Sequence, residues 1–210
     1  MTNGWTDFFA QIAVILPAFL LALTFHEFSH ALVAYLLGDD TAKKMGRLTL
    51  NPLAHVDFIG LLFLILIRFG WAKPVPFDHR NFKHPKLYSV ITALSGPFAN
   101  FLLALVCLYA VKYIPMANLE PAIIKTFVQI FATTAYVNIM LGVFNLLPLP
   151  MLDGSHILTV MLMDRYPKFI LWLYRYSFFI LLILILLPPV QAFLIRTILA
   201  VEILLQSLVI

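Results

Sequence analysis

Five long runs of apolar residues restrict this chain to very few kinds of fold. The runs cover residues 8–37, 87–111, 123–147, 169–187 and 190–210. About 20 apolar residues in a helix cross the hydrocarbon core of a bilayer, and in lipid only helices and closed barrels satisfy every backbone hydrogen bond. Because 62% of the residues are hydrophobic and only 11% are charged, we expect an all-α polytopic membrane protein.

A sixth apolar run, residues 58–67, is too short to be a good candidate for a crossing. Runs of about ten residues are more often re-entrant or interfacial than spanning. Eight of the fourteen Lys and Arg residues flank this run: Lys43, Lys44, Arg47, Arg68, Lys73, Arg80, Lys83 and Lys86. A crossing would divide them between the two faces of the membrane, against the tendency of basic residues to remain cytoplasmic. We therefore expect about five transmembrane helices plus one short re-entrant or interfacial element.

Alternation of five crossings gives a full topology. It places the N-terminus and the loop near Pro115 outside, and residues 38–87 and the C-terminus inside. We expect residues 1–210 to form a single domain in the cell membrane, either an inner or a plasma membrane. The net charge of +4 is then a topology signal, and we expect no nucleic-acid partner. A single cysteine, Cys107, excludes an internal disulfide and a thiolate zinc cluster.

The first apolar run contains ionisable residues that lipid alone would not favour. It carries the segment His26-Glu27-Phe28-Ser29-His30. On a helix, His26 and His30 lie on one face, one turn apart, and two imidazoles at that spacing can share one zinc ion, with Glu27 beside them to activate a water. Ionisable side chains inside a membrane are costly and usually functional. The motif predicts a site for one zinc per chain, with Glu27 as the catalytic residue.

A catalytic zinc site needs a third protein ligand and one open position for water. The candidate is Asp153, which follows Pro148 and Pro150 after the third long run. Proline cannot continue a helix, so Asp153-Gly154 is expected on irregular backbone, which is tolerated at membrane depth where it is buried in protein or lines a cavity. An ordinary Asp-Gly turn is the alternative. His156 is a rival for the third ligand. We rank it after Asp153 and expect it to support the ligands or to face the substrate.

These motifs resemble the site-2 protease family of intramembrane zinc metalloproteases. The resemblance is carried by the HEFSH segment, by "NLLPLPMLDG" at 145–154 and by "SGPFAN" at 95–100, and it covers most of the chain. "NPLAHVDFIG" and "GWAKPVPF" recur in the short bacterial and archaeal members, which lack PDZ and CBS domains. The resemblance implies that His26, His30 and Asp153 bind zinc, that Glu27 is the general base, and that Asn145 helps to hold the substrate or polarise its carbonyl.

Three further polar residues and one segment between two prolines are weaker candidates for substrate binding. Asn100 follows Gly96-Pro97 by one turn in the second long run. A glycine there lets another backbone approach closely, and an asparagine usually bonds across helices; a direct substrate role is the alternative, and the same two interpretations apply to Asn138. His55 is either an exposed loop histidine or part of the mouth of the site. Pro74 and Pro76 favour an extended backbone around Val75, either as a rigid loop or as an edge that pairs with an unwound substrate.

The function predicted from these residues is hydrolysis of peptide bonds in or near the transmembrane segments of other membrane proteins. The active site is expected towards the cytoplasmic side. Two alternatives remain: a non-hydrolytic zinc carrier or sensor, and a catalytically inactive scaffold that binds membrane helices. Glu27 argues against the first, and the presence of all four site residues argues against the second. Neither the substrate nor the oligomeric state follows from the sequence.

Overall fold

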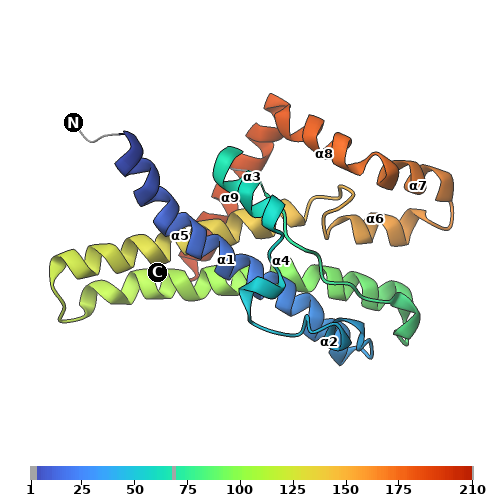
Figure 1. Ribbon diagram of the computed structural model, residues 1–210, viewed down its shortest axis with the longest axis horizontal. Helices are drawn as coiled ribbons and strands as arrows, with labels where there is room; N and C mark the ends of the chain where they lie inside the picture. Colours follow the sequence, from blue (N-terminus) through green and yellow to red (C-terminus); the bar gives the residue numbers. More distant parts are fainter. Residues whose placement is uncertain (1–3, 68–69, 210) are drawn as a thin grey trace.

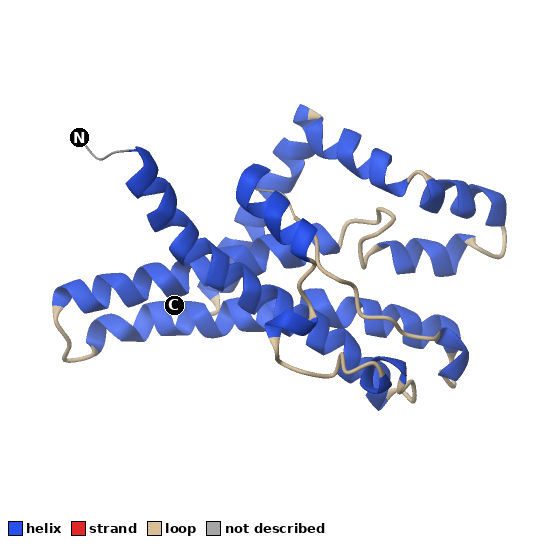
Figure 2. Ribbon diagram, viewed as in Figure 1, coloured by secondary structure: helices blue, strands red, loops and turns tan. Residues whose placement is uncertain are grey.

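The computed structural model describes residues 4–67 and 70–209, and almost all of its regular structure is helical (Figures 1 and 2). The long helices are α1 (Gly4–Leu36), α4 (Pro85–Tyr113), α5 (Pro121–Asn145) and α9 (Pro188–Ser207). The shorter ones are α2 (Thr41–Lys44), α3 (Phe58–Ile67), α6 (Ser155–Leu162), α7 (Pro167–Arg175) and α8 (Ser177–Leu186). Three single turns, η1 (Pro52–Ala54), η2 (His79–Asn81) and η3 (Ile114–Met116), lie between them.

Proline marks the starts of four of these helices. Pro85, Pro121, Pro167 and Pro188 each occupy the first helical position of α4, α5, α7 and α9. At that position the missing N–H costs nothing, because it would have no partner within the helix, and the fixed φ of proline suits the helix. A proline cannot continue a preceding helix, so these four prolines separate each helix from the segment before it.

Helices α1, α4 and α5 pack together and form the centre of the molecule. The interior between these helices is polar around His26, Glu27 and His30 and apolar elsewhere. On α4, Asn100 is completely buried, whereas Phe98 two residues earlier is 63% exposed. Small residues such as Ala22, Ala31 and Ala104 line the helix contacts, which lets the backbones approach closely. Exposed apolar side chains around a polar interior are what a lipid environment requires.

The chain segments on either side of α3 lie next to each other. Val56, just before α3, pairs with Ala72, just after it, in an antiparallel bridge. A segment whose two ends are paired in this way does not cross a membrane. The exposed side chains of Phe58, Ile59 and Leu62 on α3 suit contact with lipid. The structure therefore agrees with the predicted re-entrant or interfacial element; Arg68, one of its flanking basic residues, lies outside the described residues.

Within the described residues, four helices are long and apolar enough to cross a membrane: α1, α4, α5 and α9. The pair α7–α8 makes a fifth only if it is counted as one span, since the two helices are bent by 69°. The predicted class, an all-α polytopic membrane protein with about five spans and a short extra element, is confirmed.

The C-terminal end of α9 lies on the side opposite to the one that alternation predicted. Tyr109 and Lys112, in the last turns of α4, donate hydrogen bonds to the carbonyls of Leu208 and Val209. The end of α9 is therefore beside the loop near Pro115, which alternation over five crossings had placed on the other face. The bend between α7 and α8 explains the difference. If this bent pair does not cross the membrane, four spans remain. An even number of spans places the first turn of α1 and the last turn of α9 on the same side (Figure 1).

Candidate metal centre

Two imidazoles of α1 meet inside the three-helix centre. His26 and His30 are both buried, and their Nε2 atoms are 3.1 Å apart. The helix is continuous through this segment, so the four-residue spacing brings both rings to one face, as predicted. The rings meet edge to face, at an interplanar angle of 89°.

The third group comes from the turn between α5 and α6. Asp153 Oδ2 lies 3.0 Å from Nε2 of His26, and Oδ1 lies 3.4 Å from Nε2 of His30. Helix α5 ends at Asn145, before Pro148 and Pro150, and Met151 takes a positive φ of 74°. The turn closes when the Gly154 N–H donates to the Asn145 carbonyl at 2.8 Å. Irregular backbone thus carries Asp153 to the two histidines, from a sequence position more than a hundred residues away.

A hydrogen-bond network fixes which nitrogen of His26 carries its proton. Asn100 donates both of its Nδ2 protons, one to the Ala22 carbonyl at 3.0 Å and one to Oδ1 of Asn138 at 2.9 Å. Asn138 in turn donates to the Thr134 carbonyl. Oδ1 of Asn100 is then left to accept from Nδ1 of His26, at 2.7 Å. In the neutral imidazole the proton is therefore on Nδ1, and Nε2 presents a lone pair.

The same reasoning applies to His30. Its Nδ1 lies 2.8 Å from the Thr92 carbonyl oxygen, which can only accept. In the neutral imidazole, Nε2 of His30 therefore also presents the lone pair. Hydrogen bonds of this kind from the far ring nitrogen are what orient metal-binding histidines in general.

Three lone-pair atoms therefore converge on one point: Nε2 of each histidine and the Asp153 carboxylate. His26, His30 and Asp153 form the group among the described residues that could hold a metal ion. Oδ2 of Asp153 is buried and accepts no hydrogen bond from the described residues. Ligand atoms about 2.0–2.2 Å from a tetrahedral zinc ion lie about 3.3–3.6 Å from each other, close to the distances observed here. The donor set and its spacing fit zinc.

Glycine at position 96 allows α4 to approach this group. A Cβ atom added to Gly96 would overlap the imidazole of His30 and lie 2.7 Å from Cε1 of His26. Real Cβ atoms do not come this close to other atoms, so every other residue type would displace the two rings. The glycine of the "SGPFAN" segment is thus explained by close approach of α4 to the two histidines.

Glu27 is buried beside the metal group, with 6% of its surface exposed. Its Oε2 accepts a hydrogen bond from the Val75 N–H at 2.9 Å. Val75 belongs to the extended segment after α3, which therefore covers this side of α1. The other carboxylate oxygen, Oε1, accepts no hydrogen bond from the described residues, which leaves it available for proton transfer.

The weaker candidates lie in different environments. Asn145 is half-buried and donates to the Leu141 carbonyl of its own helix at 3.0 Å. Asn100 contacts His26 and so supports the metal group. His156 is half-buried at the start of α6 and packs its ring against Phe77 at 5.4 Å. Burial lowers the pKa of His156, which favours the neutral imidazole.

His55 is placed differently from the exposed-loop interpretation, which is wrong. The side chain is fully buried, and Nε2 donates to the Thr49 carbonyl at 2.8 Å. The Lys73 N–H donates to the His55 carbonyl, so this histidine holds its loop together. The structure does not bring it into the metal group.

Several further residues contact or support the metal group or Glu27. Those that sequence reasoning missed are Thr92, Val75 and Arg47, whereas Gly96 and Asn138 make the kind of helix contact that was expected of them. Asn138 and Gly96 had a signal, because a polar residue or a glycine in an apolar helix usually marks a helix contact. The contributions of Thr92 and Val75 come from backbone atoms, which no side-chain pattern reveals.

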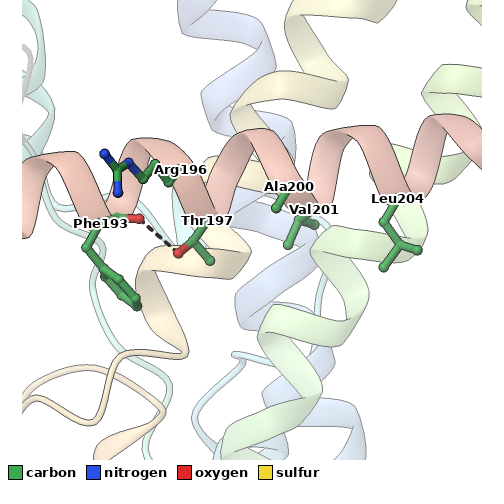
Figure 3. A pocket seen from close by; sticks show the side chains of 6 residues that line it. All are labelled: Phe193, Arg196, Thr197, Ala200, Val201 and Leu204. Carbon is green, nitrogen blue, oxygen red and sulfur yellow. Dashed lines mark hydrogen bonds between the residues drawn. The ribbon is translucent and has the colours of Figure 1, made fainter.

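A separate hollow of about 370 Å³ lies along α9. Figure 3 shows it lined by apolar side chains together with Arg196 and Thr197, all from α9. Thr197 donates to the Phe193 carbonyl of its own helix. The hollow shares no residue with the metal group, and we assign no chemistry to it.

We expect Asn100→Leu to weaken zinc binding about 10- to 100-fold, because the group that orients His26 is lost. Zinc per chain measured against a graded series of chelator concentrations would test this. Thr126→Val is the matched control: it removes a side-chain hydrogen bond to Ala122 on the exposed part of α5. Equal zinc affinity in wild type and Asn100→Leu would contradict the orienting role.

The fold and this site define a multi-pass membrane protein whose helices enclose a group of two histidines and one aspartate suited to metal binding. Comparison with protein families identifies the family to which this membrane protein belongs. The family model described as peptidase family M50 matches residues 14–184. The chain belongs to this family, and its resemblance to the site-2 proteases is confirmed.

Curated relatives agree with this assignment. The chain is 42% identical over 141 residues to "Putative zinc metalloprotease YwhC" of Bacillus subtilis, covering 66% of this chain and 64% of that protein. It is 28% identical over 183 residues to "Putative zinc metalloprotease Rip2" of Mycolicibacterium smegmatis, covering 85% of this chain and 68% of that protein. The chain thus spans about two thirds of the length of these relatives. No solved structure matches it.

Proposed function

We propose that this protein is a zinc-dependent endopeptidase that hydrolyses peptide bonds in or near the transmembrane segments of other membrane proteins. The observation that carries the proposal is the convergence of three lone-pair atoms, from His26, His30 and Asp153, with the Glu27 carboxylate beside them. Membership of a peptidase family and relatives named as zinc metalloproteases support it.

His26, His30 and Asp153 would hold the zinc. When bound, zinc supplies a Lewis acid for the peptide carbonyl and makes a water molecule more acidic. Glu27 accepts a proton from the attacking water and passes it to the nitrogen of the leaving amine. The Val75 N–H holds one oxygen of Glu27, and Asn100 and the Thr92 carbonyl keep the imidazoles in the required tautomer.

The substrate is a transmembrane segment of another protein, unwound near the scissile bond. A peptide in an intact helix keeps its amides in internal hydrogen bonds, so it must unwind before water can attack. The site lies within helices that expose apolar side chains to lipid, and a substrate held in the same bilayer can reach it from the side. The basic segment 38–87 joins the end of α1 nearest the site, which supports a site near the cytoplasmic leaflet of a cell membrane.

The test uses the purified chain in lipid nanodiscs with a labelled single-span membrane peptide. We expect one zinc per chain, cleavage that stops on chelation and returns with zinc, and loss of zinc in Asp153→Asn. Asp164→Asn is the control, because Asp164 is an exposed acidic residue in the turn after α6, paired with Lys86. Full zinc retention in Asp153→Asn would move the third ligand elsewhere, with His156 next. Folded wild type without zinc would overturn the proposal, and zinc binding without cleavage of any membrane peptide would favour a carrier or sensor.

A further inference from the structure

Arg47 is a buried arginine without a full set of partners. It is 6% exposed and follows α2 in the basic segment. One terminal nitrogen, Nη2, donates to the Lys73 carbonyl, while Nε is buried and has no acceptor among the described residues. Burying a guanidinium is costly unless it is paired. The side chain of Arg47 therefore serves either packing or a function of its charge and its hydrogen bond to Lys73.

The Glu27 carboxylate is the opposite charge that acts on Arg47. Burial lowers the pKa of Arg47, and the negative charge of Glu27 opposes that shift. The two side chains belong to different segments, α1 and the loop after α2, and both contact the extended segment that contains Val75.

The extended segment is fixed at two neighbouring points. The Lys73 carbonyl accepts from Arg47, and the Val75 N–H donates to Oε2 of Glu27 at 2.9 Å. Pro74 and Pro76 on either side have no N–H, so Val75 is the one backbone donor between positions 74 and 76. If the segment shifted by one residue, Glu27 would lose its donor.

We propose that Arg47 is a positioning residue for the general base: by holding the Lys73 carbonyl, it keeps the Val75 N–H on Oε2 of Glu27 and leaves Oε1 directed to proton transfer. This inference rests on the proposed function, in which Glu27 is the base. Arg47 touches neither the metal group nor the reacting atoms, so its effect is on the chemical step and not on zinc binding.

The first measurement is kcat and KM of Arg47→Met, with Arg80→Met as the matched control, because Arg80 is an exposed arginine nearby that bonds Asp78. Misplacing a catalytic group can cost about 100-fold in rate. We expect Arg47→Met to lower kcat about 10- to 100-fold, with KM and zinc per chain unchanged, and Arg47→Lys to recover part of the loss. Wild-type kcat in Arg47→Met, or a higher KM at unchanged kcat, would overturn the inference.

A second measurement keeps the test decisive if Arg47→Met folds poorly. Val75→Pro removes the N–H from which Glu27 accepts its hydrogen bond. We expect Val75→Pro to lose kcat as Arg47→Met does, and Arg47→Lys/Val75→Pro to be no slower than Val75→Pro alone. Additive losses would show that Arg47 acts by another route. Failure of the general-base assignment is separate, since it would appear as activity in Glu27→Gln.

Discussion

Glu27→Gln is expected to abolish peptide hydrolysis while the chain keeps one zinc. The substitution preserves the size of the side chain and an oxygen that can accept from the Val75 N–H, so the local structure is retained. It removes the group that takes the proton from water, and general-base catalysis is worth about 10²- to 10⁴-fold. Cleavage of a labelled membrane peptide and zinc per chain, measured on the same preparation, check this.

Glu120→Gln is the matched control for this prediction. Glu120 is an exposed acid at the start of α5, remote in sequence from the metal group, and its replacement should leave cleavage unchanged. If Glu27→Gln cleaved at the wild-type rate, another group would have to transfer the proton. Loss of zinc in Glu27→Gln would instead show that this carboxylate supports the metal group.

Gly96→Val is expected to destroy the metal site. The added side chain would occupy the space of the His30 and His26 imidazoles, and overpacking of this kind destabilises a folded protein by about 1–3 kcal/mol. The rings must move, which breaks their convergence with Asp153. We expect zinc per chain to fall close to zero and the thermal midpoint in detergent to fall.

Ala132→Val is the control for Gly96→Val. It adds two methyl groups at an exposed position on α5, and zinc and stability should be unchanged. Gly96→Ala is expected to give an intermediate loss, because even one Cβ atom overlaps His30. Full zinc content in Gly96→Val would mean that α4 moves away from α1 without disturbing the histidines.

Much of the site could be predicted because helical periodicity and proline chemistry are local. The four-residue spacing of His26 and His30 fixes their common face. Pro148 and Pro150 end α5 whatever surrounds them, so irregular backbone around Asp153 followed from the sequence alone. The length of the apolar runs gave the spans, and the short run 58–67 gave the element that turns back.

The remaining contacts depend on tertiary structure. Val75 reaches Glu27 across 48 positions of sequence through a backbone N–H, and nothing in the identity of a valine signals such a contact. His55 was expected to be exposed because loop histidines usually are, but it is buried and bonded to the Thr49 carbonyl and the Lys73 N–H, two contacts that depend on how the loop folds. The side on which α9 ends depends on the α7–α8 bend, which apolarity does not encode.

The hydrogen bonds that link His26 to Asn100 and Asn100 to Asn138 restrict where residues can be inserted into or deleted from this protein. Both histidines depend on α4, since His26 bonds Asn100 and His30 bonds the Thr92 carbonyl. One residue inserted between positions 92 and 100 would turn the rest of α4 by about 100° and separate the two supports. The loop at 114–120 carries neither support, so insertions and deletions there are tolerated, whereas the interval 92–100 has a fixed length.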